Sequence, residues 1–395
     1  MNVKYSDRAA RTDFPTEFTT KVLAAANDPN LISFSGGLPN PGSFPVEELR
    51  AACNAVIDKY GFKAFQYNST QGLETLRKHI CDRYKKTMNL DFDPSEIVIT
   101  NGSQQAFDIL STIFLNPGDE MMVEDPTYLG ALQSFHLYDP VILPVELQND
   151  GINVEALAET VKNHNPKFMY IIPNFQNPTG LTYTEEKRAA MAEVLKGTDV
   201  FVVEDNPYGE LRFEGVQPNS LAYYLPEQAI LLGTFSKTAA PGFRIGWIAT
   251  KNKDVMDHIL AIKSTKDLHT NSFSQMVLDE YLSANDFDAH LVEAKALYKQ
   301  RFEMMLGLME KYLPEGIEFT KPQGGMFIWV TLPEGVKAVD VQNAALKKGV
   351  AVIAGDPFYE YERNVRTMRV NYSNCTDEQM ENGVKALAET IKEFM

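Results

Sequence analysis

Residues 229–249 read AILLGTFSKTAAPGFRIGWIA and contain two apolar runs on either side of a polar loop. Both runs have the continuous apolar character of strands that are buried on both faces of a sheet. The loop between them carries Lys237, with Thr234 and Ser236 just before it and Arg244 near its end. The stretch therefore predicts two buried strands whose connecting loop presents a lysine, two hydroxyls and a guanidinium.

Similar apolar runs recur through the middle of the chain and alternate with helical patterns. One such helix is predicted to begin near Ser103, which is a good N-cap residue. Continuous apolar strands that are separated by helices are typical of a mostly parallel α/β sheet. The predicted strands are 97–100, 120–123, 168–172, 200–203, 230–232 and 245–249.

The pattern changes near Asp286, where a second unit is predicted to begin. Apolar residues from Leu291 to Met309 recur at spacings of three and four, which indicates a long helix with one apolar stripe. Strand-like runs and a closing helix from about Asp377 follow, so this unit is predicted to be α+β. Its predicted strands are 326–330, 350–353 and 368–372.

Composition excludes several classes of function. The 395 residues carry a formal net charge of −16, which argues against a nucleic-acid partner because phosphate backbones attract basic surfaces. No apolar stretch is long enough to span a bilayer, and the N-terminus shows no apolar signal segment, so we expect a cytoplasmic protein without a membrane partner. The three cysteines are far apart and the six histidines form no HExxH pair, so neither a disulfide framework nor a metal site is expected.

Polar residues follow several of the predicted strands, at the edge where open α/β sheets bind ligands. Asp205 ends an apolar run and needs a cationic or donating partner, which a protonated pyridine nitrogen would supply; a helix cap or an ion pair would also satisfy it. Tyr208 and Asn177 could donate to a phenolic oxygen of the same ligand, although Asn177-Pro178 also fits an ordinary turn. These residues predict a site for a charged heteroaromatic ligand.

Other residue types at this edge suit an aldehyde and a phosphate. Lys237 would form an imine, provided that burial and the nearby cation Arg244 keep its amine partly unprotonated. Arg244 and the helix terminus at Ser103 both suit a phosphate, although simple capping would also explain Ser103. Tyr128 could stack on a pyridine ring or pack at the rim. Arg369, inside a strand-like run, could bind a substrate carboxylate or an internal acid.

Taken in order, these motifs resemble those of class I/II aminotransferases that use pyridoxal phosphate (PLP). The most similar branch contains 2-aminoadipate, kynurenine and aromatic aminotransferases, to which 267–270 (DLHT) and 102–105 (GSQQ) point. The motifs that carry the resemblance are 34–39 (FSGGLP), Tyr67, 101–105 (NGSQQ), 177–180 (NPTG), 204–208 (EDNPY), 234–237 (TFSK), 322–327 (PQGGMF) and Arg369.

The resemblance implies fold type I, with a mostly parallel seven-stranded sheet in a large domain and a smaller α+β C-terminal domain. The implied divisions are an N-terminal segment that covers the substrate (1–45), a large PLP-binding domain (46–285) and a small domain (286–395). It also implies a homodimer with shared active sites, in which Tyr67 reaches the phosphate in the neighbouring subunit. One departure is the loop 354–358 (AGDPF), which bears on substrate specificity.

The resemblance assigns a role to each matching residue. Lys237 binds PLP covalently as a Schiff base, and Lys237, Asp205 and Tyr208 are the implied catalytic residues. Asp205 contacts the pyridine nitrogen, Asn177 and Tyr208 contact the ring oxygen, and Tyr128 stacks on the ring. The phosphate is bound by Ser103, Gln104, Thr234, Ser236, Arg244 and Tyr67, and the substrate by Gly37, Asn177 and Arg369.

The implied activity is transamination between an L-amino acid and a 2-oxo acid, with 2-oxoglutarate as the expected acceptor, by a ping-pong mechanism. The expected donors are aromatic, branched-chain or 2-aminoadipate-like amino acids. Arg8 and Arg11 could meet an acidic substrate side chain or be solvated. A β-lyase or decarboxylase would share the same residues. A PLP-sensing module of a transcription regulator is the non-enzymatic alternative; the family pattern starts near Leu31, which leaves little room for a DNA-binding domain.

Overall fold

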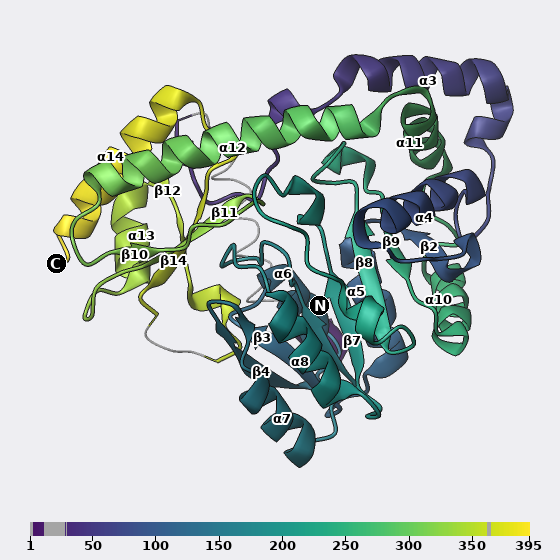
Figure 1. The fold of residues 1–395 in the computed structure, drawn as a ribbon, viewed down its shortest axis with the longest axis horizontal. Coiled ribbons are helices and arrows are strands. Elements are labelled where there is room, and N and C mark those ends of the chain that lie inside the picture. The colour runs from purple at the N-terminus through teal and green to yellow at the C-terminus, as the bar shows by residue number, and fades with distance from the viewer. Residues whose placement is uncertain (1–2, 12–27, 29, 362–364) are drawn as a thin grey trace.

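The computed structural model describes residues 3–11, 28, 30–361 and 365–395. Its largest feature is a sheet with the strand order β2-β9-β8-β7-β6-β3-β4-β5, beside which lies a four-stranded sheet built from the C-terminal part of the chain (Figure 1). The strands of the large sheet are β2 (Ile97–Thr100), β3 (Glu120–Asp125), β4 (Val141–Gln148), β5 (Gly151–Ile152), β6 (Phe168–Ile171), β7 (Phe201–Asp205), β8 (Ala229–Thr234) and β9 (Gly246–Ala249).

The large sheet is mostly parallel, as the sequence predicts. Strands β4, β3, β6, β7 and β8 run parallel to one another, whereas β9 lies antiparallel between β8 and β2. The eighth strand is the two-residue β5, which pairs antiparallel with the end of β4 at the sheet edge. The apolar runs do not reveal β4, because this strand near the edge is only partly buried and contains Pro144.

Helices cover both faces of this sheet. Alternate side chains of each strand point to opposite faces of the sheet. One face packs against α5, α6 and α10, and the other face packs against α4, α11, α7 and α8. The helices of this part are α1 (Asp7–Ala10), α3 (Val46–Tyr60), α4 (Glu74–Met88), α5 (Ser103–Phe114), α6 (Leu129–His136), α7 (Val154–Asn163), α8 (Glu185–Leu195), α9 (Leu221–Tyr224), α10 (Lys253–Lys266) and α11 (Ser272–Ala284).

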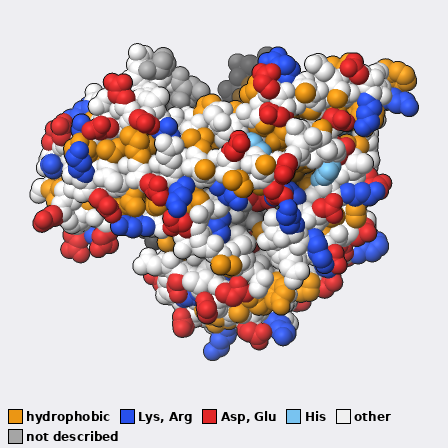
Figure 2. All heavy atoms as spheres, turned by 45° about the horizontal axis from the view of Figure 1, so that its top comes forward, with side chains coloured by type: hydrophobic (Ala, Val, Ile, Leu, Met, Phe, Trp, Pro, Cys, Tyr) orange, Lys and Arg blue, Asp and Glu red, His pale blue; other side chains and the backbone are white. Residues whose placement is uncertain are grey.

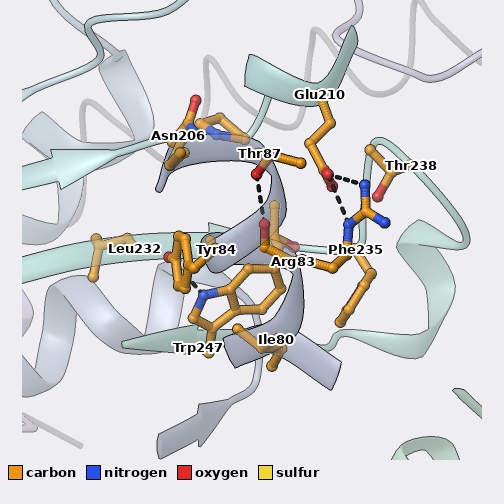
Figure 3. A pocket seen from close by; sticks show the side chains of 14 residues that line it. Ile80, Arg83, Tyr84, Thr87, Asn206, Glu210, Leu232, Phe235, Thr238 and Trp247 are labelled. Atoms are coloured by element: carbon orange, nitrogen blue, oxygen red, sulfur yellow. Dashed lines mark hydrogen bonds and ion pairs between the residues drawn. The ribbon is translucent and has the colours of Figure 1, made fainter. Parts of the chain in front are cut away.

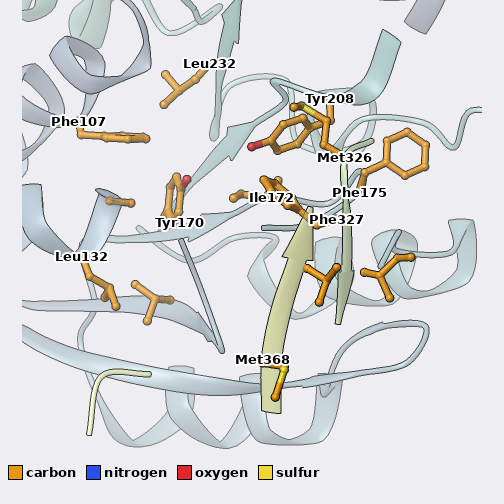
Figure 4. Close-up of a cluster of buried hydrophobic side chains, with 14 of the residues drawn as sticks. Phe107, Leu132, Tyr170, Ile172, Phe175, Tyr208, Leu232, Met326, Phe327 and Met368 are labelled. Atoms are coloured by element: carbon orange, nitrogen blue, oxygen red, sulfur yellow. The ribbon is translucent and has the colours of Figure 1, made fainter. Parts of the chain in front are cut away.

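The core of the first face extends into the C-terminal part of the chain. Phe107 of α5 packs edge-on against Tyr170 of β6, with ring centroids 5.3 Å apart, and Tyr208 meets Phe327 of the small sheet at 5.7 Å (Figure 4). Tyr170 and Phe327 are fully buried. The two sheets therefore share one apolar core, and the loop that contains Tyr208 lies where they meet.

The C-terminal part is α+β, as predicted. Helix α12 (Phe287–Tyr312) runs along one side of the molecule, from the region of α11 to α14 (Figure 1), and includes the helix predicted over 291–309. A capping box between Thr376 and Gln379 starts α14 (Asp377–Lys392), where the closing helix is predicted. The remaining elements are β10 (Glu318–Phe319), β11 (Phe327–Thr331), α13 (Ala338–Lys347), β12 (Val350–Ala351), β13 (Ile353–Ala354) and β14 (Thr367–Asn371); domain divisions after residues 45 and 285 stay a prediction.

The N-terminal segment runs along this C-terminal part. Strand β1 (Ile32–Ser33) pairs parallel with β12, and the carbonyl of Phe34 accepts a hydrogen bond from the backbone N–H of Asn371 at 2.8 Å. Part of the predicted substrate cover (1–45), residues 1–2, 12–27 and 29, lies outside the described residues. Arg8 and Arg11, for which a substrate side chain or solvent is the predicted partner, contact the loop after α6 in the structure: Arg11 pairs with Asp139 at 2.6 Å, and Arg8 lies over the ring of Tyr138 at 4.9 Å.

The surface combines both signs of charge. Acidic and basic side chains are interspersed over the face that Figure 2 shows, and the formal net charge is −16. Among the described residues, we find no helix with the length and apolar character needed to cross a bilayer.

Candidate active site

The predicted site residues meet at the carboxyl-terminal edge of the large sheet. They follow β2, β3, β6, β7 and β8, and Arg244 precedes β9, which runs in the opposite direction and so begins at the same edge. A cavity of about 130 Å³ lies there. Its lining includes these predicted residues: Ser103, Gln104, Tyr128, Asn177, Asp205, Tyr208, Thr234, Ser236, Lys237 and Arg244.

Asp205, the last residue of β7, is a buried carboxyl with two donors. It accepts hydrogen bonds from the hydroxyl of Tyr170 at 3.0 Å and, weakly, from that of Ser103 at 3.5 Å. Burial raises the pKa of Asp205 to about 7, and the Tyr170 hydrogen bond opposes this rise. The carboxyl therefore retains accepting capacity toward the cavity, and a cation there would keep it ionised.

Tyr170 is a site residue that the sequence analysis missed. It lies in the middle of β6, which was interpreted only as an apolar strand, and its ring is fully buried. A buried phenol requires a hydrogen-bond acceptor. The signal was the tyrosine within the run 168–172, although the sequence alone did not identify Asp205 as its acceptor.

Lys237 lies in the loop after β8 and reaches the N-terminal segment. Its Nζ donates to the carbonyl of Gly37 at 2.7 Å. Burial lowers the pKa of Lys237 to about 8, and the nearby guanidinium groups of Arg369 and Arg244 add to this effect. A lysine with this pKa has an appreciable neutral, nucleophilic fraction near neutral pH.

Arg369, in β14 of the small sheet, places a buried guanidinium against Asn177, a residue that lines the cavity. Its Nη1 donates to Oδ1 of Asn177 and its Nη2 to the carbonyl of Ser35, both at 2.7 Å. These partners are neutral, and burial lowers the pKa of Arg369 to about 10. Arg369 therefore forms no salt bridge with these two partners, although an internal salt bridge was the predicted alternative. Its positive charge remains available to an anion.

Two aromatic rings that the sequence analysis did not single out flank this guanidinium. The carbon Cζ of Arg369 lies 4.3 Å from the ring centroid of Phe327 and 5.0 Å from that of Phe358. Gly37 also lies close to Phe327, since a Cβ at Gly37 would come within 3.2 Å of that ring. Contact with two aromatic rings restricts the orientation of the planar cation.

The start of α5 differs in one respect from the prediction. Gly102, and not Ser103, is the N-cap, so the hydroxyl of Ser103 is free to face Asp205. Gly102 has a φ of 71°, and a Cβ there would lie 2.6 Å from Nη2 of Arg244. Only glycine satisfies both requirements, and it brings Arg244 close to the helix terminus, where an anion is favoured.

The other predicted phosphate contacts are arranged in two ways. The hydroxyls of Thr234 and Ser236 lie 2.8 Å apart in the loop before Lys237. The side chain of Gln104 lines the cavity, yet its amide already donates to Ser134 of α6 at 2.5 Å. A phosphate near the start of α5 would therefore bind Ser103, Thr234, Ser236 and Arg244 more directly than the side-chain amide of Gln104.

Asn177 is held by a buried polar network that the sequence analysis also missed. Its amide donates to the hydroxyl of Tyr208 at 3.4 Å. The preceding Gln176 donates to Glu124 at 3.0 Å and accepts from the backbone N–H of Thr179 at 2.9 Å. Burial raises the pKa of Glu124 to about 7, and the hydrogen bond from Gln176 opposes this rise. The network therefore fixes the loop that carries Asn177.

Tyr67 does not line the cavity. Its side chain is 79% exposed, and its ring meets that of His269 edge-on at 5.8 Å. Its position on the surface agrees with the prediction that it acts on a neighbouring subunit, which stays a prediction here.

A second, smaller cavity of about 40 Å³ lies behind the loop that carries Lys237 (Figure 3). Helix α4 contributes Arg83, which pairs with Glu210, and Tyr84, whose hydroxyl accepts from the indole N–H of Trp247 at 2.8 Å. Thr238 of the loop also lines this cavity. These contacts support the loop that carries Lys237. The predicted catalytic residues line the first cavity.

The groups around the first cavity fit pyridoxal phosphate. Asp205 has accepting capacity for a protonated ring nitrogen, Lys237 has a nucleophilic amine for an aldehyde, and Arg244 lies at the helix terminus for a phosphate. Among residues 3–11, 28, 30–361 and 365–395, no group of three or more metal-ligating side chains comes together.

Comparison with known proteins gives the same assignment. The family described as "Aminotransferase class I and II" matches residues 35–387. The chain is 39% identical to aromatic-amino-acid aminotransferase 1 of Thermococcus litoralis, covering 95% of this chain and 91% of that protein. It is 33% identical to 2-aminoadipate transaminase of Thermus thermophilus, covering 94% of this chain and 93% of that protein.

Solved structures agree. The structure of kynurenine aminotransferase from Pyrococcus horikoshii, in complex with PMP, superposes with a TM-score of 0.92 at 39% identity, covering 98% of this chain and 97% of that one. The matched region, residues 35–387, extends beyond Gly37 and Arg369 and so includes every predicted site residue. The chain belongs to the class I and II aminotransferases, and it is a pyridoxal-phosphate-dependent enzyme of fold type I.

Proposed function

We propose that this aminotransferase moves the amino group of an aromatic, branched-chain or 2-aminoadipate-like L-amino acid to a 2-oxo acid, with 2-oxoglutarate as acceptor, in two alternating half-reactions. The observation that carries the proposal is that Lys237 and Asp205 line one cavity, and that Arg369 donates to Asn177, which lines the same cavity. The names of the related enzymes support the aromatic and 2-aminoadipate-like donors.

In this proposal Arg369 and Asn177 bind the α-carboxylate of the donor. Nη1 of Arg369 already donates to Oδ1 of Asn177 at 2.7 Å, so a carboxylate would accept from the guanidinium and from the amide nitrogen of Asn177. The rings of Phe327 and Phe358 both contact the guanidinium, and in this proposal they offer apolar surface to an aromatic or aliphatic substrate. Binding at this point would place the Cα of the donor toward Lys237.

Pyridoxal phosphate, when bound, supplies the aldehyde and an electron-withdrawing ring. Asp205 would hold the charged ring nitrogen, and Tyr208 and Asn177 would donate to the ring oxygen. Lys237 would take the proton from Cα of the donor and later give it up, which requires an amine that can be neutral at one stage and protonated at the next. A pKa of about 8 allows both states near neutral pH.

We also propose that the chain works as a homodimer. An exposed apolar patch supports this: the side chains of Phe62, Phe65 and Tyr67 are 78%, 70% and 79% exposed, and Leu268 is 47% exposed. Large aromatic side chains exposed together are typical of an interface. Sedimentation velocity at micromolar concentration should give the mass of a dimer, and a monomer that retains full activity would contradict shared active sites.

The pH dependence of cofactor capture provides a test of Lys237. Because burial and the two arginines lower its pKa to about 8, the neutral amine is about a tenth of the total at pH 7 and predominates above pH 8. The rate at which the apoprotein binds pyridoxal phosphate covalently should therefore rise with pH through about 8 and then level off. Stopped-flow absorbance measures this rate, and a midpoint near pH 10 would contradict a depressed pKa.

Arg369→Gln tests the carboxylate contact. Losing a charged, two-point contact costs about 1.5–3 kcal/mol, so kcat/KM for the donor should fall roughly 10- to 100-fold, mainly through KM. Arg366→Gln, three residues earlier and exposed, is the matched control and should leave kcat/KM unchanged. If both variants keep wild-type kcat/KM, the carboxylate binds elsewhere.

A further inference from the structure

Lys263 in α10 is a fully buried lysine that the proposed mechanism does not use. Its Nζ lies 3.0 and 2.9 Å from the two carboxylate oxygens of Asp267, 3.1 Å from Oε1 of Gln105 and 3.0 Å from the hydroxyl of Thr270. A buried ammonium is tolerated only where such partners surround it. Its partners come from two separate segments, the first turn of α5 and the turn after α10.

Asp267 connects this lysine to the loop between β2 and α5. Its Oδ2 accepts from the side-chain amides of Asn101 and Gln105, both at 2.7 Å. Gln105 in turn accepts from the backbone N–H of Asn101 at 2.8 Å. Both ends of the segment 101–105 are therefore tied to one carboxylate, and the segment contains Gly102 and Ser103.

The segment that the network holds has little freedom to move. A Cβ at Gly102 would lie 2.6 Å from Nη2 of Arg244, so even a small shift of this loop changes its fit against that guanidinium. Neither Lys263 nor Asp267 is among the residues that line the cavity. Any effect of this pair on the cavity is therefore indirect.

The same network holds the turn beside Tyr67. Thr270 donates to the carbonyl of Ile99 at 3.2 Å, while His269 contacts the ring of Tyr67. The residue between Asp267 and His269, Leu268, has a φ of 64° and is 47% exposed. The buried pair thus sets the geometry of the loop before α5 and of a turn on the exposed apolar patch.

We propose that Lys263 and Asp267 are positioning residues for the cofactor phosphate: they hold the segment 101–105 so that Ser103 and the first N–H groups of α5 face the phosphate together with Arg244. The inference rests on the proposed placement of the phosphate at this end of the cavity. Outer contacts that orient a ligand-binding group affect affinity even without touching the ligand, by roughly 10- to 100-fold at metal sites. A comparable effect is expected here, and it should be specific to the phosphate.

The test compares pyridoxal phosphate with pyridoxal, which lacks the phosphate. Dissociation constants of both are measured by absorbance on the apoprotein of full-length wild type, Asp267→Asn, and the double variant Lys263→Met/Asp267→Asn, which leaves no unpaired buried charge. The Kd for pyridoxal phosphate should rise about tenfold or more in both variants. The Kd for pyridoxal should stay within about twofold, because the ring and lysine contacts are untouched.

Lys266→Met is the matched control. Lys266 lies in the same helix and pairs with Asp108 of α5 at 2.5 Å, so the variant also removes an ion pair between α10 and α5, but at an exposed position. Neither dissociation constant should change in this control. A similar rise for pyridoxal phosphate in Lys266→Met would mean that any loosening of α10 has this effect, and it would overturn the proposal.

Arg244→Gln tests separately whether the phosphate lies near Arg244, so that an error in this placement can be told apart from an error in the role of Lys263 and Asp267. If Arg244→Gln weakens only pyridoxal phosphate while both Asp267 variants bind it normally, the placement holds and the positioning role is wrong. If Arg244→Gln does not change the preference for the phosphorylated ligand, the placement itself fails. An equal loss of both ligands in the Asp267 variants, or loss of the apoprotein fold in both by circular dichroism, would assign the pair to fold stability and overturn the proposal.

Discussion

Lys237→Ala is expected to abolish covalent retention of the cofactor and to lower kcat by about 10³-fold or more. The variant loses the nucleophile for the aldehyde and also the acid–base group, and the latter alone contributes roughly 10²- to 10⁴-fold. The charged groups that lower the pKa of this buried amine are Arg369 and Arg244. A guanidinium stays protonated, so neither arginine can replace Lys237 as a base. Borohydride reduction followed by peptide mapping and a steady-state assay measure the two effects.

Lys253→Ala is the control for this experiment. Lys253 lies on the exposed start of α10, where it pairs with Asp257 at 2.6 Å. This variant should retain both the labelled peptide and wild-type kcat. Stable labelling of another lysine in Lys237→Ala, with activity preserved, would refute the assignment of Lys237.

Asp205→Asn should have the second largest effect. Asparagine preserves the shape of the side chain, and it can still accept from Tyr170, but it cannot stabilise a charged ring nitrogen. Breaking a buried charge pair costs about 3 kcal/mol or more, so kcat should fall roughly 100-fold. Single-turnover measurement of the first half-reaction isolates this loss from substrate binding.

Glu204→Gln offers a matched comparison one residue earlier in β7. Glu204 is equally buried, but it faces away from the cavity and accepts from Ser220 at 2.8 Å and from the backbone N–H of Leu221 at 2.7 Å. Its replacement should lower thermal stability without slowing the single-turnover rate. If Asp205→Asn keeps its rate and Glu204→Gln loses it, the roles of the two carboxylates are wrongly assigned.

The sequence predicted well the parts that depend on local pattern. Continuous apolar runs identified the buried strands, and the polar residues just after them lie together because parallel strands share one carboxyl-terminal edge. Arg369 was predicted as a buried cation because it interrupts an apolar run. These inferences need only the immediate neighbours of each residue along the chain.

The parts that were missed depend on contacts across the fold. Tyr170 appeared to be one more apolar strand residue, and only the pairing of β6 with β7 brings it to Asp205. Ser103 was expected to cap α5, but the approach of Arg244 and the positive φ place Gly102 at that position. Strand β4 was not recognised because its position near the sheet edge leaves it only partly apolar.

The measurement that tests the central claim most directly is the visible absorption spectrum of the purified holoenzyme during addition of single L-amino acids without any 2-oxo acid. If the cofactor bound to Lys237 accepts the amino group, its visible band should disappear while the pyridoxamine phosphate band grows. Aromatic, branched-chain or 2-aminoadipate-like donors should react fastest. A band that persists through the whole amino-acid panel would contradict the proposed transamination.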